Sequence, residues 1–156
     1  MQEKASVKNS LAEKVWKTLQ GMYGDDARFY LESFVFGLEG VASVTEVSLE
    51  ASIVIGLICD VLSSELKRRV ECIISCGVGS DRDKEVSVYY YTEVNGVKVI
   101  IAQADHKWWA VATGYTYDEY ENCSKEERVQ ILLEELEKYI KDILEECRET
   151  LKKLNL

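Results

Sequence analysis

The sequence contains no proline, a single histidine and no long hydrophobic run. Without proline, every tight turn must be made by glycine, asparagine, aspartate or serine. The Asn95-Gly96 pair is therefore a strong candidate for a turn. The most apolar stretch, Ala51–Leu62, is interrupted by Asp60 and is shorter than the roughly 20 residues that a helix needs to cross a bilayer. The sequence therefore predicts no membrane-spanning segment and no membrane partner.

Basic residues are also fewer than acidic ones. The chain has 19 Lys and Arg against 28 Asp and Glu, a formal net charge of −9. Long-range repulsion of this sign opposes binding to nucleic acids and to anionic membranes. Hydrophobic residues make up 47% and charged residues 30%, the balance of a soluble globular protein. With 156 residues, we expect a single domain spanning residues 1–156.

The chain has five cysteines, an odd number: Cys59, Cys72, Cys76, Cys123 and Cys147. Residues 1–20 lack the continuous apolar segment of an export signal. We therefore expect free thiols in a reducing compartment and a cytoplasmic location. In an extended strand Cys72 and Cys76 would lie about 13 Å apart, too far to share one zinc ion, so we expect no resident cofactor.

Helical patterns dominate the N-terminal half. A first helix begins at Ser10, or near Ser6 if Val7 belongs to it. A second runs from Asp25 to Gly40, and a third runs from Ser43 to about Arg69. The first and third starts have capping-box spacing, and acidic residues open the second. Apolar residues almost encircle the middle of the third helix, which predicts a buried central helix. The basic residues 67–69 would complement its dipole.

The pattern after residue 70 is typical of strands. Val70–Val78 is short and β-branched, Glu85–Val94 and Val97–Asp105 flank Asn95-Gly96, and Trp108–Tyr117 forms a possible fourth strand. Asn-Gly between two such runs is a strong hairpin signal. A long helix then follows to the C-terminus. The expected fold class is α+β, with a helical N-terminal half, an antiparallel three- to four-stranded meander and a long C-terminal helix.

The Asn95-Gly96 turn also predicts a register. It places Val94 opposite Val97 and Glu93 opposite Lys98, the second a favourable charge pair. An uninterrupted ladder then pairs Tyr91 with Ile100, Tyr90 with Ile101, Val86 with Asp105 and Glu85 with His106. Strand alternation predicts a core face with Tyr90, Val88 and Ile101, and an opposite face with Tyr91, Ile100, Ala102 and Ala104.

An acidic cluster at the open end of this hairpin suggests an enzyme. Asp81, Asp83 and Glu85 alternate, so an early strand would place them on one face, with His106 opposite and Lys107 beside it. Such groups hold Mg²⁺ or Mn²⁺, and the metal can activate water for phosphodiester hydrolysis. The alternative function is therefore a metal-dependent nuclease. In that case the metal ligands would be Asp81, Asp83 and Glu85. The catalytic residues would be Asp83, Glu85, His106 and Lys107, and the partner would be nucleic acid.

A simpler interpretation competes with this one. Residues 80–84 form a polar connection, and loops are commonly charged because they are exposed to solvent. The strand 97–105 also shows Gln103-Ala104-Asp105 in place of the Glu-x-Lys pattern of restriction-type nucleases.

The C-terminal helix gives the strongest indication of an interaction. Ser124 and Glu127 have capping-box spacing, and apolar residues follow in steps of four and three, interrupted only by Thr150: Val129, Leu133, Leu136, Ile140, Ile143, Cys147 and Leu154. Thirty helical residues extend about 45 Å, more than the roughly 30–40 Å of a compact domain of this size. We therefore expect part of the stripe to project and pair with a second copy, although packing entirely within the domain stays open.

The leading function predicted from the sequence is a small acidic interaction module. It would be a cytoplasmic homodimer that uses the C-terminal helix and the aromatic face of the sheet.

Overall fold

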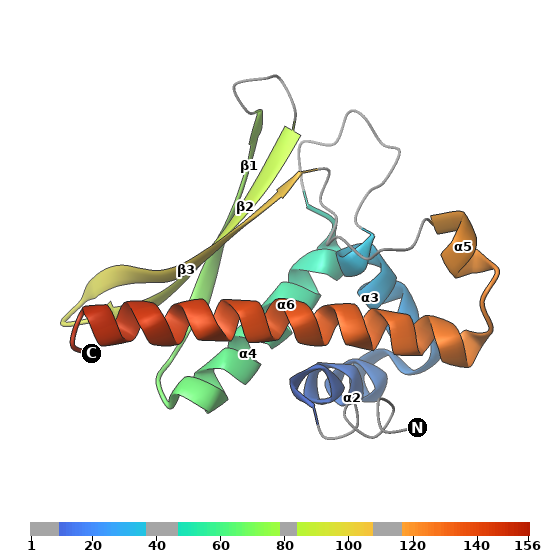
Figure 1. Ribbon diagram of the computed structural model, residues 1–156, viewed down its shortest axis with the longest axis horizontal. Coiled ribbons are helices and arrows are strands. Elements are labelled where there is room, and N and C mark those ends of the chain that lie inside the picture. The colour runs from blue at the N-terminus through green and yellow to red at the C-terminus, as the bar shows by residue number, and fades with distance from the viewer. Residues whose placement is uncertain (1–9, 37–46, 79–83, 108–116) are drawn as a thin grey trace.

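A computed structural model describes residues 10–36, 47–78, 84–107 and 117–156 of the protein (Figure 1). The elements in chain order are α2 (Leu11–Tyr23), the 3₁₀-helix η1 (Gly24–Asp26), α3 (Ala27–Val35), α4 (Leu49–Leu66), β1 (Glu71–Val78), β2 (Lys84–Val94), β3 (Val97–Lys107), α5 (Tyr117–Glu121) and α6 (Lys125–Lys153). The predicted α+β class is confirmed, with a helical N-terminal half, an antiparallel three-stranded sheet and a long C-terminal helix. No helix in the described ranges is long and apolar enough to span a membrane.

Serine hydroxyls cap three helices at their first turns. Ser10 Oγ accepts from the Glu13 amide at 3.2 Å, and Ser124 Oγ accepts from the Glu127 amide at 3.2 Å. Both caps agree with the capping-box spacing in the sequence. Ser48 Oγ caps α4 by accepting from the Ala51 amide at 3.1 Å.

The predicted bounds of the central helix are wrong at both ends. Val47 and Ser48 are not helical, so α4 begins at Leu49 and not at Ser43. It ends at Leu66, where Lys67 takes a left-handed conformation with φ of 54°. The basic residues 67–69 therefore lie beyond the last turn, in the connection to β1. The interior position of α4 is confirmed, because it contacts α2, α3, α6 and β1 and its buried side chains belong to the hydrophobic core.

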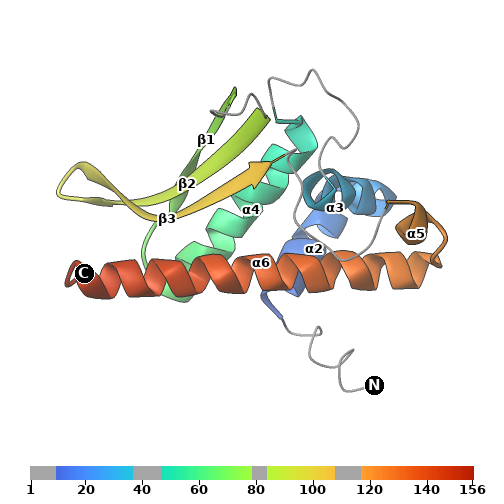
Figure 2. The ribbon, with the colours of Figure 1, turned by 45° about the horizontal axis from the view of Figure 1, so that its top comes forward.

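The sheet is a meander in the order β1-β2-β3 (Figure 2). The turn pairs Val94 with Val97, and the predicted register holds through the pairing of Tyr91 with Ile100. A β-bulge then follows, and Tyr90 pairs with Ala102 instead of Ile101. Beyond this point the predicted register is wrong by one residue.

The bulge changes which residues of β3 belong to the core. A shift of one residue exchanges the two faces of a strand. Ala102 is buried and Ala104 packs against the hydrophobic core, although an uninterrupted ladder assigns both to the opposite face. Ile101, at the bulge, is buried as well. Gln103 is exposed instead.

Helix α6 lies along the length of the molecule in both views, from the end formed by α2, α3 and α5 to the β2–β3 hairpin (Figures 1 and 2). It contacts α2, α3, α4 and β3. Its buried side chains include nearly the whole apolar stripe: Ile131, Leu132, Leu133, Leu136, Tyr139, Ile140, Ile143, Leu144, Cys147 and Leu151. Within one chain the stripe is therefore covered as far as Leu151, because α4 and the sheet extend under it, and Leu154 at its end is exposed. Pairing with a second copy stays a prediction.

The predicted bounds of the second helix are also wrong. Residues Gly24–Asp26 form a 3₁₀-helix, and α3 runs from Ala27 only to Val35, before the predicted end at Gly40. Most of the possible fourth strand lies outside the described residues, and its last residue, Tyr117, is the first residue of α5.

Candidate functional site

The residues predicted to bind metal lie at the edge of the described structure. Asp81 and Asp83 are outside the described residues, and of Glu85, His106 and Lys107 only the backbone is described. The register places Glu85 opposite Lys107, and Val86 opposite His106. The predicted pairing of Glu85 with His106 is therefore wrong, because the bulge shifts β3 by one residue. Among the residues whose side chains are described, no group of three His, Cys, Asp or Glu could hold a metal ion.

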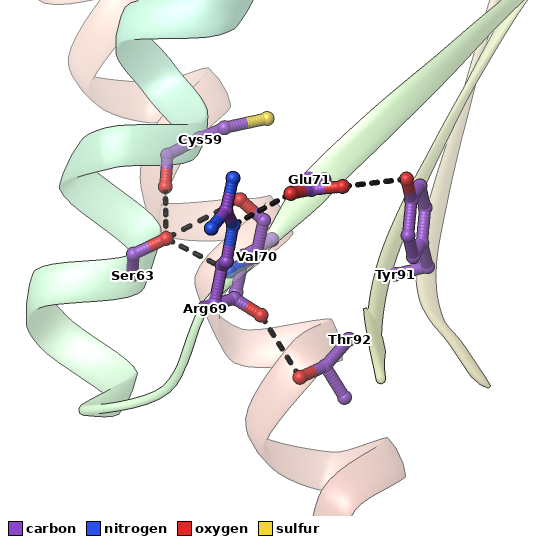
Figure 3. Close-up of polar contacts among 7 residues, drawn as sticks. All are labelled: Cys59, Ser63, Arg69, Val70, Glu71, Tyr91 and Thr92. Atoms are coloured by element: carbon purple, nitrogen blue, oxygen red, sulfur yellow. Dashed lines mark hydrogen bonds and ion pairs between the residues drawn. The ribbon is translucent and has the colours of Figure 1, made fainter. Parts of the chain in front are cut away.

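A network of polar contacts lies instead where α4 meets the first strand (Figure 3). Ser63 Oγ accepts a hydrogen bond from the Val70 amide at 2.8 Å and donates to the Cys59 carbonyl at 2.8 Å. Thr92 Oγ1 donates to the Arg69 carbonyl at 2.9 Å. The start of β1 is thus fixed to α4 on one side and to β2 on the other.

The carboxylate of Glu71 is held between two side chains in this network. Tyr91 Oη donates to Glu71 Oε2 at 2.7 Å, and Arg69 Nε approaches Glu71 Oε1 at 2.6 Å. The hydrogen bond from Tyr91, together with the charge of Arg69, holds the pKa of Glu71 below its ordinary value. The same bond raises the pKa of Tyr91. Lys98 Nζ lies 5.0 Å from the centre of the Tyr91 ring, within cation–π range.

These residues border an open groove of about 490 Å³, lined by Arg68, Arg69, Glu71, Tyr91, Thr92 and Glu93. The lining has two guanidinium groups and two carboxylates, so its charges balance. The sequence places the basic residues 67–69 at a predicted helix end and gives no sign of this groove, because the groove forms only where the α4–β1 connection meets β2.

A second groove, of about 380 Å³, lies between β3 and α6 and is strongly acidic, with Gln103, Asp142, Ile143, Glu145, Glu146 and Glu149 as its lining. The Gln103 amide donates to Glu146 Oε2 at 3.0 Å. This bond uses a backbone donor of β3 and ties that strand to α6.

The layer between the sheet and the helices contains buried thiols and phenols. The hydroxyls of Tyr90 and Tyr139 are 2.7 Å apart. Cys59, on α4, is buried in the hydrophobic core, and Cys72, on β1, is partly buried against it. Cys147, on α6, is also buried, and burial raises the pKa of its thiol to about 12. Cys59, Cys72, Cys123 and Cys147 are all free.

The face of the sheet that points away from the helices carries exposed apolar side chains. Ile73 of β1 is 44% exposed and Ile100 of β3 is 52% exposed. Within the described residues, no strand pairs with the other edge of β1. The sheet is therefore covered on one face and along the β3 edge, and open on its other face and along the β1 edge.

Comparisons with protein families, with curated proteins and with solved structures find nothing that matches this chain.

Proposed function

We propose that the protein is an interaction module that forms a homodimer through the free edge of β1. The observation that carries the proposal is an eight-residue edge strand, Glu71–Val78, with an exposed isoleucine near its centre and no described neighbour on one side. An edge strand presents unpaired amide and carbonyl groups that pair readily with another strand. A second copy supplies a strand of identical sequence, and antiparallel pairing around a two-fold axis joins the two sheets into one.

The composition of β1 supports pairing. Monomeric proteins protect edge strands with lysine, proline or short length. The sequence Glu-Cys-Ile-Ile-Ser-Cys-Gly-Val has neither lysine nor proline. A long and unprotected edge of this kind is more typical of an interface than of a solvated surface.

The low charge of β1 also favours pairing through this strand. Two copies of a chain with a net charge of −9 repel each other. Glu71 is the single charged residue of the strand, and Arg69 neutralises it at 2.6 Å. Approach through β1 therefore brings little like charge together, and at physiological salt a Debye length of about 8 Å screens the remainder.

The site of association proposed here differs from the one expected from the sequence. The apolar stripe of α6 is already covered by the chain's own core through Leu151, so it offers little surface for pairing. Of the open sheet face, only the β1 edge with Ile73 takes part in the proposed interface.

Sedimentation velocity over a range of micromolar concentrations tests the proposal. The wild type should form dimers, and Ile73→Lys should be a folded monomer, because a lysine on an edge strand opposes pairing with another strand. Ile100→Lys is the matched control, because it places the same charge on the same face, on the strand away from the free edge. It should remain dimeric. A wild type that is monomeric at every concentration, or an Ile73→Lys variant that still dimerises, would refute the proposal.

A second candidate is a Mg²⁺- or Mn²⁺-dependent nuclease at the end of the hairpin. Its support is the β2–β3 register, which pairs Glu85, a candidate metal ligand, with Lys107, a candidate stabiliser of negative charge. Glu85→Gln should abolish Mn²⁺-dependent cleavage of DNA or RNA while the circular dichroism spectrum is unchanged. Wild-type protein with no cleavage of either nucleic acid in Mg²⁺ or Mn²⁺ would eliminate this candidate.

A further inference from the structure

Basic side chains from three segments gather at one end of the molecule, although the chain as a whole is acidic. Arg68 Nη2 donates to the main-chain oxygen of Leu156 at 3.1 Å, so the α4–β1 connection lies against the C-terminal end of α6. Figures 1 and 2 place the same end of α6 beside the β2–β3 hairpin, which carries Lys98. The basic residues of these segments are Lys67, Arg68, Arg69, Lys98, Lys152 and Lys153. This end therefore attracts anions locally, against the net charge of −9.

The groove beside Glu71 lies in this region and is large enough to hold a small molecule. Its volume of about 490 Å³ falls within the range of about 300–1,000 Å³ that is usual for ligand sites. The Tyr91 ring in its wall is 7% exposed, and Lys98 Nζ lies 5.0 Å from the ring centre. This wall therefore offers little aromatic surface on which a planar ligand could stack. The groove fits a polar, charged ligand.

Two contacts hold Arg69 in place at the wall of the groove (Figure 3). Its carbonyl oxygen accepts from Thr92 Oγ1 at 2.9 Å, and its Nε approaches Glu71 Oε1 at 2.6 Å. The Arg69 side chain is nevertheless 86% exposed, so the two terminal nitrogens of its guanidinium can reach a ligand. A side chain that is oriented before binding loses less conformational freedom on contact. The planar guanidinium also matches the geometry of phosphate oxygens.

The two carboxylates of the groove have different surroundings. Both oxygens of Glu71 already have partners, because Oε2 accepts from Tyr91 Oη at 2.7 Å and Oε1 is paired with Arg69. The Glu71 charge is thus compensated and does not repel an anion strongly. Glu93 is exposed and lies opposite Lys98 in the β2–β3 ladder. A carboxylate in this position can accept hydrogen bonds from hydroxyl groups.

We propose that this groove binds a small phosphate-bearing molecule that also carries hydroxyl groups, such as a sugar phosphate or a polyol phosphate. The guanidinium groups of Arg68 and Arg69 hold the phosphate, and Glu93 accepts hydrogen bonds from the hydroxyls. A phosphomonoester carries a charge of about −1.5 to −2 at neutral pH, which suits two guanidinium groups better than a single carboxylate does. Ligand binding is a property separate from pairing at the β1 edge, and it is measured separately.

Titration of the ¹⁵N-labelled full chain with glycerol 3-phosphate, followed by amide NMR at constant ionic strength, tests the proposal. We expect saturable shifts of the amides of residues 68–71 and 91–93. Glycerate is the matched ligand, because it keeps two hydroxyls and replaces the phosphate by a carboxylate, and it should bind more weakly. Absence of saturable shifts at these residues with millimolar glycerol 3-phosphate would overturn the proposal, as would equal affinity for glycerate.

Variants of two basic residues test the role of the arginines. Arg69→Gln should weaken the binding of glycerol 3-phosphate about tenfold, because a charge-assisted hydrogen bond is lost. Lys125→Gln is the matched control, because it removes the same charge from the exposed first residue of α6, at the opposite end of that helix. It should bind as the wild type does. Unchanged affinity in Arg69→Gln, or an equal loss in Lys125→Gln, would refute the proposed site, and the amide spectrum of each variant shows whether it is folded.

Phosphates of larger molecules present the same chemistry, and two measurements separate these cases. The first compares a single-stranded oligonucleotide with glycerol 3-phosphate in the same titration. The second is co-sedimentation with vesicles that contain phosphatidic acid. Because the net charge of −9 opposes both polyanions, we expect no binding to either. Tighter binding of the oligonucleotide than of glycerol 3-phosphate, or sedimentation of the protein with the vesicles, would overturn the assignment to a small molecule.

Discussion

Replacing Ile140 and Ile143 together by aspartate tests whether the apolar stripe of α6 is core or interface. Ile140 is 0% exposed and Ile143 is 5% exposed within one chain. If this burial is correct, the double variant places two carboxylates in the hydrophobic core, and the domain should unfold. If the stripe served to pair two copies, the same variant should be a folded monomer.

The expected loss can be worked from the burial of the two side chains. Removing a buried isoleucine forfeits about 1.5–3 kcal/mol of transfer free energy, and burying an unpaired carboxylate costs several kcal/mol more. Two such sites together cost about 10 kcal/mol. Natural domains have unfolding free energies of about 5–15 kcal/mol, so the variant should have no stable folded state.

Circular dichroism and tryptophan fluorescence during urea unfolding measure this loss. Leu154→Asp is the matched control, because Leu154 is the last residue of the same stripe but is 47% exposed. Its unfolding midpoint should stay close to that of the wild type. A double variant that keeps the wild-type spectrum and sediments as a monomer would refute the intramolecular packing of α6.

Three further variants test individual contacts. Tyr139→Phe should lower the free energy of unfolding, measured in urea, by about 1–3 kcal/mol, because the buried Tyr90 hydroxyl loses its hydrogen-bond partner at 2.7 Å. Adding Tyr90→Phe to this variant should recover most of that loss. Ser124→Ala should cost about 1 kcal/mol by removing the cap of α6. Tyr91→Phe should raise the pKa of Glu71, followed by NMR titration of its carboxyl carbon, because the Tyr91 hydrogen bond is the main cause of the lowered value. A lowered folded-state pKa gives stability that is present above the unfolded-state pKa and is lost as pH falls through the folded-state value. The wild type should therefore be more stable to unfolding than this variant at neutral pH, and the two should be equally stable in acid. An unchanged pKa of Glu71 would contradict the assignment.

Local signals in the sequence predicted most of the elements correctly. The caps at Ser10 and Ser124 and the turn at Asn95-Gly96 each depend on a few adjacent residues, and each agrees with the structure. The predicted start of α4 is wrong because Ser43 has capping-box spacing to Glu46, although Ser48 also offers a capping hydroxyl. The structure uses Ser48, which lacks that glutamate.

Features that depend on contacts between distant segments could not be predicted in the same way. The groove beside Glu71 combines the α4–β1 connection with Tyr91 of β2, about 20 positions further along the chain. The burial of the α6 stripe depends on where α4 and the sheet lie. A helix that is apolar along one side looks the same in the sequence whether its neighbour is the same chain or another copy.

The bulge in β3 is the exception, because its signal is present in the sequence. The alternation of Val97 and Val99 with Lys98 continues as far as Ile101, and then Ala102 and Ala104 alternate with Gln103 and Asp105 in the opposite phase. Without an extra residue, the ladder would point Gln103 and Asp105 at the hydrophobic core, where unpaired polar groups are costly. With the bulge, Gln103 and Asp105 hydrogen-bond to each other at 3.0 Å on the solvent side. A change of phase in a period-two pattern therefore predicts a bulge, and here it decides which residue faces Glu85.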